Sequence, residues 1–288
     1  MKVLVLGGGG QVAHAVAAGA PANHSLIVKS RQDLDITDEA ALASAVAGSG
    51  ADWIVNGAAY TAVDRAETEP DLARRINDTA VGVMARAAAR SGCRLLHLST
   101  DFVFDGKSNR AYLPADQTNP LNIYGTTKLG GEQQVLKSDG DAIILRTAWV
   151  YASSGRNFAL TMLRLLREKD EVRVVCDQIG TPTWATGIAG AIWGLIDESA
   201  AGGIYHWTDL GVATWYDFAT AIQDEALTLG LLARAVPVIP ISTADYPTPA
   251  RRPAFSVLNT EVSRALVKAP ARHWRHNLRM MLDELRAE

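Results

Sequence analysis

The sequence predicts an α/β fold, a doubly wound parallel sheet with helices on both faces and a smaller α+β C-terminal lobe. Short apolar runs recur through the first 150 residues, and helix-type segments separate them. The runs are continuous rather than alternating, which is typical of parallel strands that are buried on both faces. Four glycines follow the first run directly, before a helix-type segment. Together these observations predict a Rossmann-type sheet.

The first 150 residues supply the expected sheet and its helices. Strands are expected at 2–6, 25–30, 52–59, 94–100 and 142–150, and helices at 11–20, at 70–91 and around 122–132. Another helix begins after Thr37 or Asp38, because either side chain could cap its N-terminus. Pro70 at the start of the long helix and Gly92 just past its end are the usual boundary residues.

The pattern changes from residue 151 onward, and we expect a second lobe there. Helices are expected at 157–170, up to 196 and at 215–229, and strands at 172–175 and 203–207. The prolines between 237 and 253 preclude a long regular element and favour an ordered loop. The expected domains are a cofactor-binding domain, 1–150, and a substrate-binding lobe, 151–288. The boundary is approximate, and segments of the two can interleave.

Composition excludes several classes of function. Hydrophobic residues make up 48% and charged residues 20% of the 288 residues, which is ordinary for a globular protein and not for a disordered one. The net charge is −3 without a charged block, so nucleic acid and anionic membranes are not expected as partners. Cys93 and Cys176 are too few for a disulfide framework. No secretion signal is visible and no apolar stretch reaches the ~20 residues that span a bilayer, so we expect a cytoplasmic protein.

The glycine-rich loop is the first candidate site. Gly7, Gly10 and Ala13 are three residues apart, directly after a strand and opening a helix. In that position backbone N–H groups and the helix N-terminus can bind a pyrophosphate, although a turn without a ligand is the alternative. An acid at the end of the second strand would favour NAD. Ser30 and Arg31 occur there instead and suit the 2′-phosphate of NADPH, with NADH as the other option.

Tyr124 and Lys128 are four residues apart in a helix-type segment, so they share one helix face. A nearby ammonium lowers the pKa of a phenol, and such a pair suits proton transfer to a carbonyl. The preceding strand ends in Ser99 and Thr100, at the sheet edge where α/β proteins bind ligands. Either hydroxyl could hydrogen-bond the substrate, and their spacing does not separate them. A chance surface pair is the alternative, but the order of glycine loop, hydroxyl and Tyr/Lys helix favours catalysis.

This order of motifs resembles that of the extended short-chain dehydrogenase/reductases. Within them, long segments are similar to the dTDP-4-dehydrorhamnose reductase family, namely LDITD, VNGAAYTAVDRAE, STDFVFDG, NIYGTTKLGGE, RTAWVY, NFALTMLRL, DQIGTPT and YPTPARRPAFSVL. With the glycine loop they extend from Gly7 to Leu258. The resemblance implies reduction of the C4 carbonyl of dTDP-4-dehydro-6-deoxy-L-mannose by NADPH. The product would be dTDP-L-rhamnose, a precursor of cell-surface polysaccharide.

The resemblance also implies a role for individual residues. Thr100, Tyr124 and Lys128 would be catalytic, with Tyr124 as the proton donor. The cofactor would contact Gly7, Gly10, Gln11, Val12, Ser30, Arg31, Asp35, Ile36, Ala58, Ala59, Thr61, Ser99, Tyr124 and Lys128. The substrate would contact Val63, Thr100, Phe102, Trp149, Asn157, Arg252 and Ser256. Trp149 as a core residue and Arg252 as a surface cation are the alternatives.

Two departures from the family pattern limit the expected ligands and partners. Some members use Mg²⁺ between subunits, but Ala15 and Thr186 stand where acidic ligands would be needed. Hard cations require oxygen ligands, so no metal is expected, and a homodimer stays open.

Two other functions also stay open. Nucleotide-sugar 4,6-dehydratases and 4-epimerases share the fold, but a dehydratase needs an acid where Phe102 stands. A non-catalytic NADP-binding regulatory subunit, such as that of methionine adenosyltransferase, would retain the same motifs. Turnover of NADPH with a keto-sugar nucleotide separates these functions.

Overall fold

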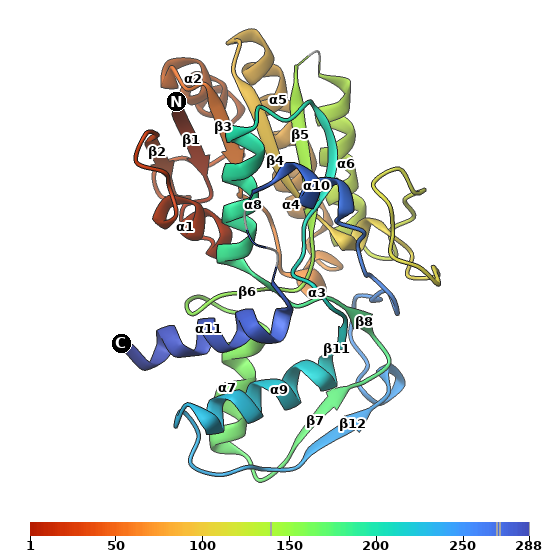
Figure 1. Ribbon diagram of the computed structural model, residues 1–288. Coiled ribbons are helices and arrows are strands. Elements are labelled where there is room, and N and C mark those ends of the chain that lie inside the picture. The colour runs from red at the N-terminus through yellow and green to blue at the C-terminus, as the bar shows by residue number, and fades with distance from the viewer. Residues whose placement is uncertain (139, 269, 271, 288) are drawn as a thin grey trace.

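The computed structural model describes residues 1–138, 140–268, 270 and 272–287. Its largest element is a six-stranded sheet in the order β2-β1-β3-β4-β5-β10 (Figure 1). Every pair of neighbouring strands in it is parallel, which confirms the predicted α/β class. The strands are β1 (Lys2–Leu6), β2 (Ser25–Lys29), β3 (Trp53–Asn56), β4 (Arg94–Thr100), β5 (Ala142–Thr147) and β10 (Gly203–His206).

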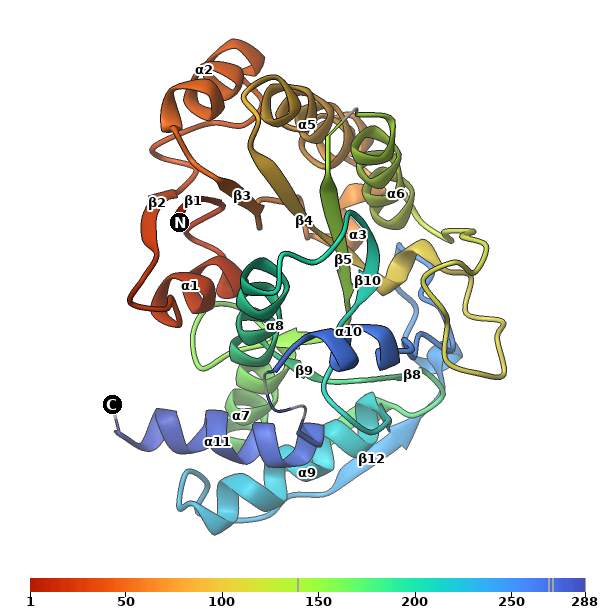
Figure 2. The same ribbon diagram turned by 45° about the horizontal axis from the view of Figure 1, so that its top comes forward.

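Helices cover both faces of the sheet (Figure 2). Val3 and Val5 of β1 belong to a core shared with α1 (Gln11–Ala18) and α8 (Ala185–Asp197). Leu4 and Leu6 belong to the opposite core, which they share with α2 (Glu39–Ser49) and α5 (Ala80–Arg90). Because successive side chains of a strand point to opposite faces, an uninterrupted apolar strand is what such a two-sided sheet requires. The doubly wound arrangement is therefore confirmed.

The long helix predicted at 70–91 is continuous but not uniform. It consists of α4 (Pro70–Arg74), a π-helical turn (Arg75–Thr79) and α5. The turn contains Asn77, which is 0% exposed. Its side chain accepts a hydrogen bond from Tyr60 N (2.8 Å) and donates one to Tyr60 O (3.0 Å). The wider turn therefore ties this helix to the segment that follows β3.

Capping and strand length refine three further predictions. Asp38, not Thr37, caps α2, because its carboxylate accepts from Ala41 N (2.9 Å). Strand β3 ends at Asn56 and is shorter than the predicted 52–59, and α3 (Val63–Ala66), which follows it, was not predicted. The strand expected at 142–150 is split into β5 and β6 (Val150–Tyr151), because Trp149 has a φ of +47°.

The second lobe lies at the carboxyl edge of the sheet, below it in Figure 1. Its core, around Tyr151, Leu163, Phe218 and Leu278, is formed mainly by three helices and the strands beside them. The predicted proline-rich segment contains only short elements, among them one strand that pairs parallel with β7. The lobe contains β6, α7 (Phe158–Glu168), β7 (Val172–Val175), β8 (Ile179–Gly180), β9 (Thr183–Trp184), β11 (Ala213–Thr214), α9 (Trp215–Thr228), β12 (Val238–Ile241) and α11 (Trp274–Ala287).

Segments of the second half of the chain return to the sheet. Strand β10 pairs with β5, α8 packs on α1, and α10 (Glu261–Leu266) packs on both α8 and β10. The division into 1–150 and 151–288 remains a prediction, and we propose that these three elements belong with the sheet. Within the part of the chain described here, no helix is both long enough and apolar enough to cross a membrane.

Candidate active site

A cleft of about 590 Å³ lies at the carboxyl ends of the central strands. Strands β1 and β3 are neighbours there although β2 separates them in the chain, so the cleft lies at a topological switch point. Most of the predicted site residues line it, namely Gly10, Gln11, Val12, Ala59, Thr61, Val63, Ser99, Thr100, Phe102, Tyr124, Lys128, Trp149 and Arg252.

The glycine loop has the backbone that a dinucleotide requires. Gly7 has a φ of +85°, and a Cβ there would lie 2.6 Å from Ala58 N, so no side chain fits. Gly10 is the N-cap of α1, and no side chain caps the helix. The first N–H groups of α1 are therefore available to an anion beside Gln11 and Val12. The loop fits the pyrophosphate of a nicotinamide cofactor.

The end of β2 is basic, as expected. The carboxylate of Asp33 accepts from Ser30 N (2.8 Å) and Ser30 Oγ (2.7 Å), which holds the turn in which Arg31 is exposed. Asp35 accepts from Thr37 N and Oγ1, and these hydrogen bonds lower its pKa.

The guanidinium groups of Arg31 and Arg75 lower the pKa of Asp35 further. Arg75, the first residue of the π-helical turn, was not predicted, because it is distant in the chain from the end of β2. Two cations beside this turn suit a 2′-phosphate. Ile36, also predicted at the cofactor, is buried under this segment.

Tyr124 is positioned by the start of α6 (Ile123–Lys137). Asn122 caps this helix by accepting from Gly125 N (2.7 Å). A Cβ on Gly125 would overlap the carbonyl oxygen of Phe102, so glycine lets α6 approach the end of β4. The rings of Phe102 and Tyr124 meet edge to face, 5.6 Å between centroids. The phenol therefore lies at the carboxyl end of β4, beside Thr100.

The pKa of Tyr124 is raised to about 12, and not lowered as the Tyr/Lys spacing predicts. Burial is the main cause, the Thr100 hydroxyl counteracts it, and the charge of Asp101 adds to it. Lys128 is not among the groups that shift the pKa of Tyr124 in this conformation, and its Nζ is turned to β4, where it donates to Leu98 O (2.6 Å). Burial lowers the pKa of Lys128 to about 8, against the opposing effect of Glu132.

The structure separates the two candidate hydroxyls. Ser99 Oγ donates to the buried carboxylate of Glu132. Arg146 donates to both oxygens of the same carboxylate, at 2.8 and 2.6 Å. The Ser99 hydroxyl is thus part of an internal ion pair, whereas Thr100 faces the phenol. This geometry supports Thr100 as the hydroxyl that acts with Tyr124.

Two buried polar atoms that line the cleft have no hydrogen-bond partner among the described residues. They are Asp101 Oδ2 and Thr147 Oγ1, on side chains 2% and 7% exposed. Buried polar atoms are rarely left without a partner, so both are suited to the hydroxyl groups of a ligand. Burial raises the pKa of Asp101 to about 6. Sequence reasoning missed both residues, although Asp101 directly follows Thr100 in its motif.

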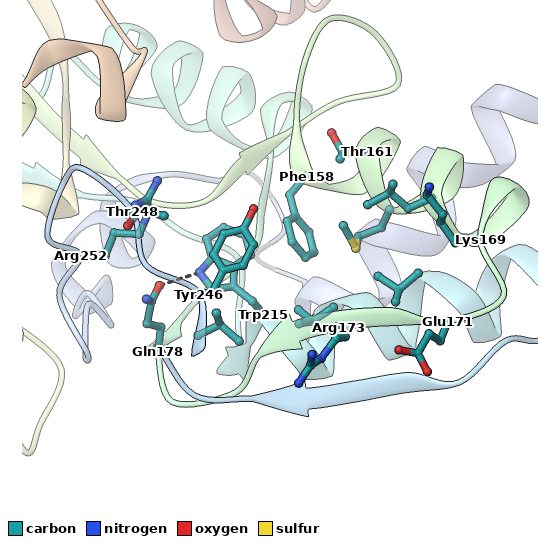
Figure 3. Close-up of a pocket in the computed structure, with 15 residues that line it drawn as sticks. Phe158, Thr161, Lys169, Glu171, Arg173, Gln178, Trp215, Tyr246, Thr248 and Arg252 are labelled. Carbon is teal, nitrogen blue, oxygen red and sulfur yellow. Dashed lines mark hydrogen bonds between the residues drawn. The ribbon is translucent and has the colours of Figure 1, made fainter. Parts of the chain in front are cut away.

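Trp149 and Trp215 form an aromatic wall of the cleft. Trp149 lies parallel to Trp215, which donates from Nε1 to Gln178 Oε1 at 3.2 Å. Trp149 lines the cleft and is not core filler. Beyond Trp215 is a second cavity of about 510 Å³, with Phe158 and Tyr246 on its wall (Figure 3). Trp215 had no signal in the sequence, since its role depends on the fold of the second lobe.

Three further predicted residues, Asn157, Arg252 and Ser256, lie in or beside the cleft. Asn157 caps α7 through Leu160 N and donates to Gln11 Oε1 (2.8 Å), so it ties the glycine loop to the second lobe. Arg252 lines both cavities and pairs with both oxygens of Asp64, at 3.1 and 2.8 Å. Ser256 is buried, and its hydroxyl lowers the pKa of Asp101.

Asn157 and Ser256 therefore do not line the cleft themselves, and their contact with substrate stays a prediction. Within the described ranges, no group of three or more His, Cys, Asp or Glu side chains could hold a metal ion.

Comparison with known proteins gives consistent matches over nearly the whole chain. The family described as RmlD substrate binding domain matches residues 1–287. A dTDP-4-dehydrorhamnose reductase of Burkholderia thailandensis is 40% identical over 295 residues, which cover 99% of each chain. A dTDP-4-dehydrorhamnose reductase structure from Clostridium acetobutylicum superposes with a TM-score of 0.93 at 36% identity, covering 99% of this chain and 100% of the other. A Bacillus anthracis enzyme of that name, in complex with NADP, has a TM-score of 0.92 at 33% identity and covers 98% and 99%.

Proposed function

This chain belongs to the RmlD substrate binding domain family, and we propose that it reduces dTDP-4-dehydro-6-deoxy-L-mannose to dTDP-L-rhamnose with NADPH. The observation that carries the proposal is the position of Tyr124. Its phenol lies in the cleft beside Thr100, at the sheet edge onto which the glycine loop opens. A reduction of this kind needs a hydride and a proton, delivered to the two ends of one carbonyl group.

The cofactor would be held by the glycine loop and the neighbouring strand ends. The free N–H groups at the start of α1 suit the pyrophosphate, and Arg31 with Arg75 suits the 2′-phosphate. Ala59 and Thr61, which follow β3, line the adjoining part of the cleft, and Ala58 lies beside Gly7. When bound, NADPH supplies the hydride.

The proton would come from Tyr124. A pKa of about 12 keeps the phenol protonated at neutral pH, so Oη retains its proton until a carbonyl oxygen gains negative charge. Thr100 is placed to hold the same oxygen, which stabilises that charge. Lys128 can act on the phenol only after Nζ turns from Leu98 O into the cleft, where its cation would favour release of the proton.

The two cavities suit the two ends of a nucleotide sugar. Trp149 offers a flat face to the sugar ring, while Asp101 and Thr147 offer unpartnered oxygens to its hydroxyl groups. Arg252 lies between the cavities and suits the diphosphate. Phe158, Trp215 and Tyr246 would then pack on the base in the second cavity (Figure 3).

The other functions find less support. At the position where a dehydratase needs a second acid, the Phe102 ring packs on Tyr124. A regulatory subunit would leave the unpartnered oxygens of Asp101 and Thr147 without a ligand. A cytoplasmic location and a homodimer also stay proposals. Sedimentation of the purified protein tests the homodimer.

The test is NADPH consumption in the presence of the keto-sugar nucleotide, followed by the absorbance of the reduced nicotinamide, with NADH run in parallel. We expect rapid turnover with NADPH and a loss of about 10²–10⁴-fold in kcat for Tyr124→Phe. Tyr205→Phe is the matched control, because its hydroxyl donates to the backbone of Ala201 and to no other residue that the structure describes. A folded protein that binds NADPH but gives no turnover would refute the reductase and support a regulatory subunit.

A further inference from the structure

A buried histidine stands directly behind Lys128. His97, on β4, is 0% exposed, and its Nε2 lies 3.4 Å from Lys128 Nζ. On the other side of the ring, Nδ1 lies 2.9 Å from the side-chain nitrogen of Asn56 on β3. Gly131 of α6 closes the site, since a Cβ there would lie 3.4 Å from Nε2. The ring is therefore enclosed between Asn56 and Lys128.

The orientation of Asn56 selects the tautomer of His97. Ala58 N donates to Asn56 Oδ1 at 3.1 Å, which turns the amide oxygen to Ala58 and the NH₂ group to His97 Nδ1. A ring nitrogen that faces an NH₂ group must accept, so Nδ1 carries no proton. Burial, followed by the charge of Lys128, lowers the pKa of His97 well below its usual range, so the ring is neutral. Its single proton is then on Nε2, facing Lys128.

An imidazole N–H and an ammonium are both donors and cannot bond to each other. A neutral amine, in contrast, accepts from the N–H through its lone pair and can still donate to Leu98 O. The separation of 3.4 Å between Nε2 and Nζ is longer than an ordinary charge-assisted hydrogen bond.

The other ionisable groups near Nζ do not reverse this preference. Glu132, one turn along α6, favours the ammonium, but Arg146 of β5 neutralises its charge at 2.6 Å. Tyr124, on the same helix face, is a neutral phenol at neutral pH. Asp101, at the end of β4, acts on the phenol of Tyr124.

We propose that His97 is a positioning residue for Lys128. The Nε2–H group of His97 favours the neutral amine of Lys128 while Nζ is turned to β4. The amine gains its proton when Nζ turns into the cleft. This inference rests on the proposed function, in which Lys128 serves NADPH and Tyr124. Its consequence is that Lys128 takes up a proton when NADPH binds. Ala58, a predicted cofactor contact, orients Asn56 and so determines the tautomer of His97 that favours the neutral amine.

The size of the proton uptake depends on pH. With Nζ at β4 the pKa of Lys128 is about 8, and in a cleft that favours the cation it returns towards the ordinary 10.5. Between these values the complex binds more protons than the free protein. Uptake is therefore about half a proton per NADPH at pH 8 and approaches one above it. The 2′-phosphate of NADPH, with a pKa of about 6, adds little at this pH.

Calorimetric titration with NADPH in two buffers of different ionisation enthalpy counts the protons directly. We expect uptake in the wild type and in His24→Gln, a matched control whose buried ring bonds Asp197 far from Lys128. His97→Gln should reduce it, because the amide can offer its oxygen to the ammonium and a larger fraction of Lys128 is then already charged. Equal uptake in His97→Gln and the wild type would overturn the proposal.

A second measurement needs no variant. The ¹⁵N spectrum of the wild-type imidazole should show His97 protonated on Nε2, and a proton on Nδ1 would refute the proposed role. Both measurements omit the sugar nucleotide, so their outcome is separate from the turnover that tests the proposed reductase.

Discussion

Trp149 and Trp215 stack face to face, with ring centroids 3.5 Å apart and planes 3° from parallel. The two indoles come from opposite sides of the site, one from the turn after β5 and the other from the first residue of α9. Gly180 bounds the pair, since a Cβ there would lie 2.5 Å from the ring of Trp149. The second lobe therefore determines where the proposed sugar-binding ring is held.

Replacing Trp215 by alanine removes this support from Trp149. Stacked aromatic pairs contribute about 0.5–1.5 kcal/mol beyond the area that they bury, so we expect KM for the nucleotide sugar to rise about 10-fold with a smaller change in kcat. Steady-state kinetics of Trp215→Ala and Trp215→Phe measure this, and the phenylalanine variant should retain most of the affinity. An unchanged KM in Trp215→Ala would exclude a role for the stack in binding.

The two hydroxyls at the end of β4 should differ in their effect on activity. Thr100→Val should lower kcat about 10–100-fold, because its hydroxyl faces the phenol, and should cost about 0.5–2 kcal/mol of stability, because the same hydroxyl accepts from Phe102 N and donates to Asp101 Oδ1. Ser99→Ala should keep most of the activity and lose about 1.5–3 kcal/mol of unfolding free energy, because Glu132 loses a donor. Kinetics and urea unfolding of both variants measure the two effects. The reverse pattern would assign the catalytic hydroxyl to Ser99.

Gly7→Ala should strongly weaken NADPH binding. The substitution combines a φ of +85° with a Cβ 2.6 Å from Ala58 N, so the glycine loop and the cofactor wall must move apart. Gly92→Ala is the control, because Gly92 also has a positive φ, +65°, but its Cβ meets nothing. That variant should lose about 1 kcal/mol of stability and keep its affinity. Fluorescence titration with NADPH tests this, and equal affinities would show that the loop does not hold the cofactor.

Asp209 should make the protein less stable as the pH rises. Burial raises the pKa of this carboxyl to about 7 from the 3.8 of an exposed one, although it accepts from Trp184 N. Between these values the folded protein holds a proton that the unfolded chain releases, so unfolding free energy falls with increasing pH.

Between pH 5 and pH 8, Asp209 alone should lower the unfolding free energy by about 2–3 kcal/mol. Asp209→Asn keeps an acceptor for Trp184 and removes the titration. Urea unfolding of both proteins at the two pH values should therefore show a smaller fall in the variant. Parallel falls would mean that Asp209 is ionised throughout.

The strands and helices that could be predicted from the sequence are those determined by local pattern. The run at 94–100 is a strand of the same length in the structure, and Asp38 caps its helix through a local hydrogen bond. The split after β5 could not be predicted, because the positive φ of Trp149 is imposed by the contacts of its ring in the second lobe. The π-helical turn similarly depends on Tyr60, 17 residues before Asn77.

The candidate site shows the same division between local and tertiary causes. Spacing places Tyr124 and Lys128 on one helix face, but burial decides the pKa of the phenol and β4 decides where Nζ lies. Trp215 and Arg75 reach the site only through folding, so no motif indicates them. Asn157 matches a family motif, yet its side chain holds Gln11 rather than lining the cleft.

The placement of β10 at the edge of the sheet has a consequence for synthesis of the chain. A nascent polypeptide that has emerged only as far as residue 150 has β5 as an exposed edge strand, since β10 is missing, and lacks α8, which covers one face of the sheet. Such an intermediate exposes both a hydrogen-bonding edge and apolar surface, the features that recruit chaperones or lead to aggregation. The six-stranded sheet is therefore complete only after residue 206 has left the ribosome.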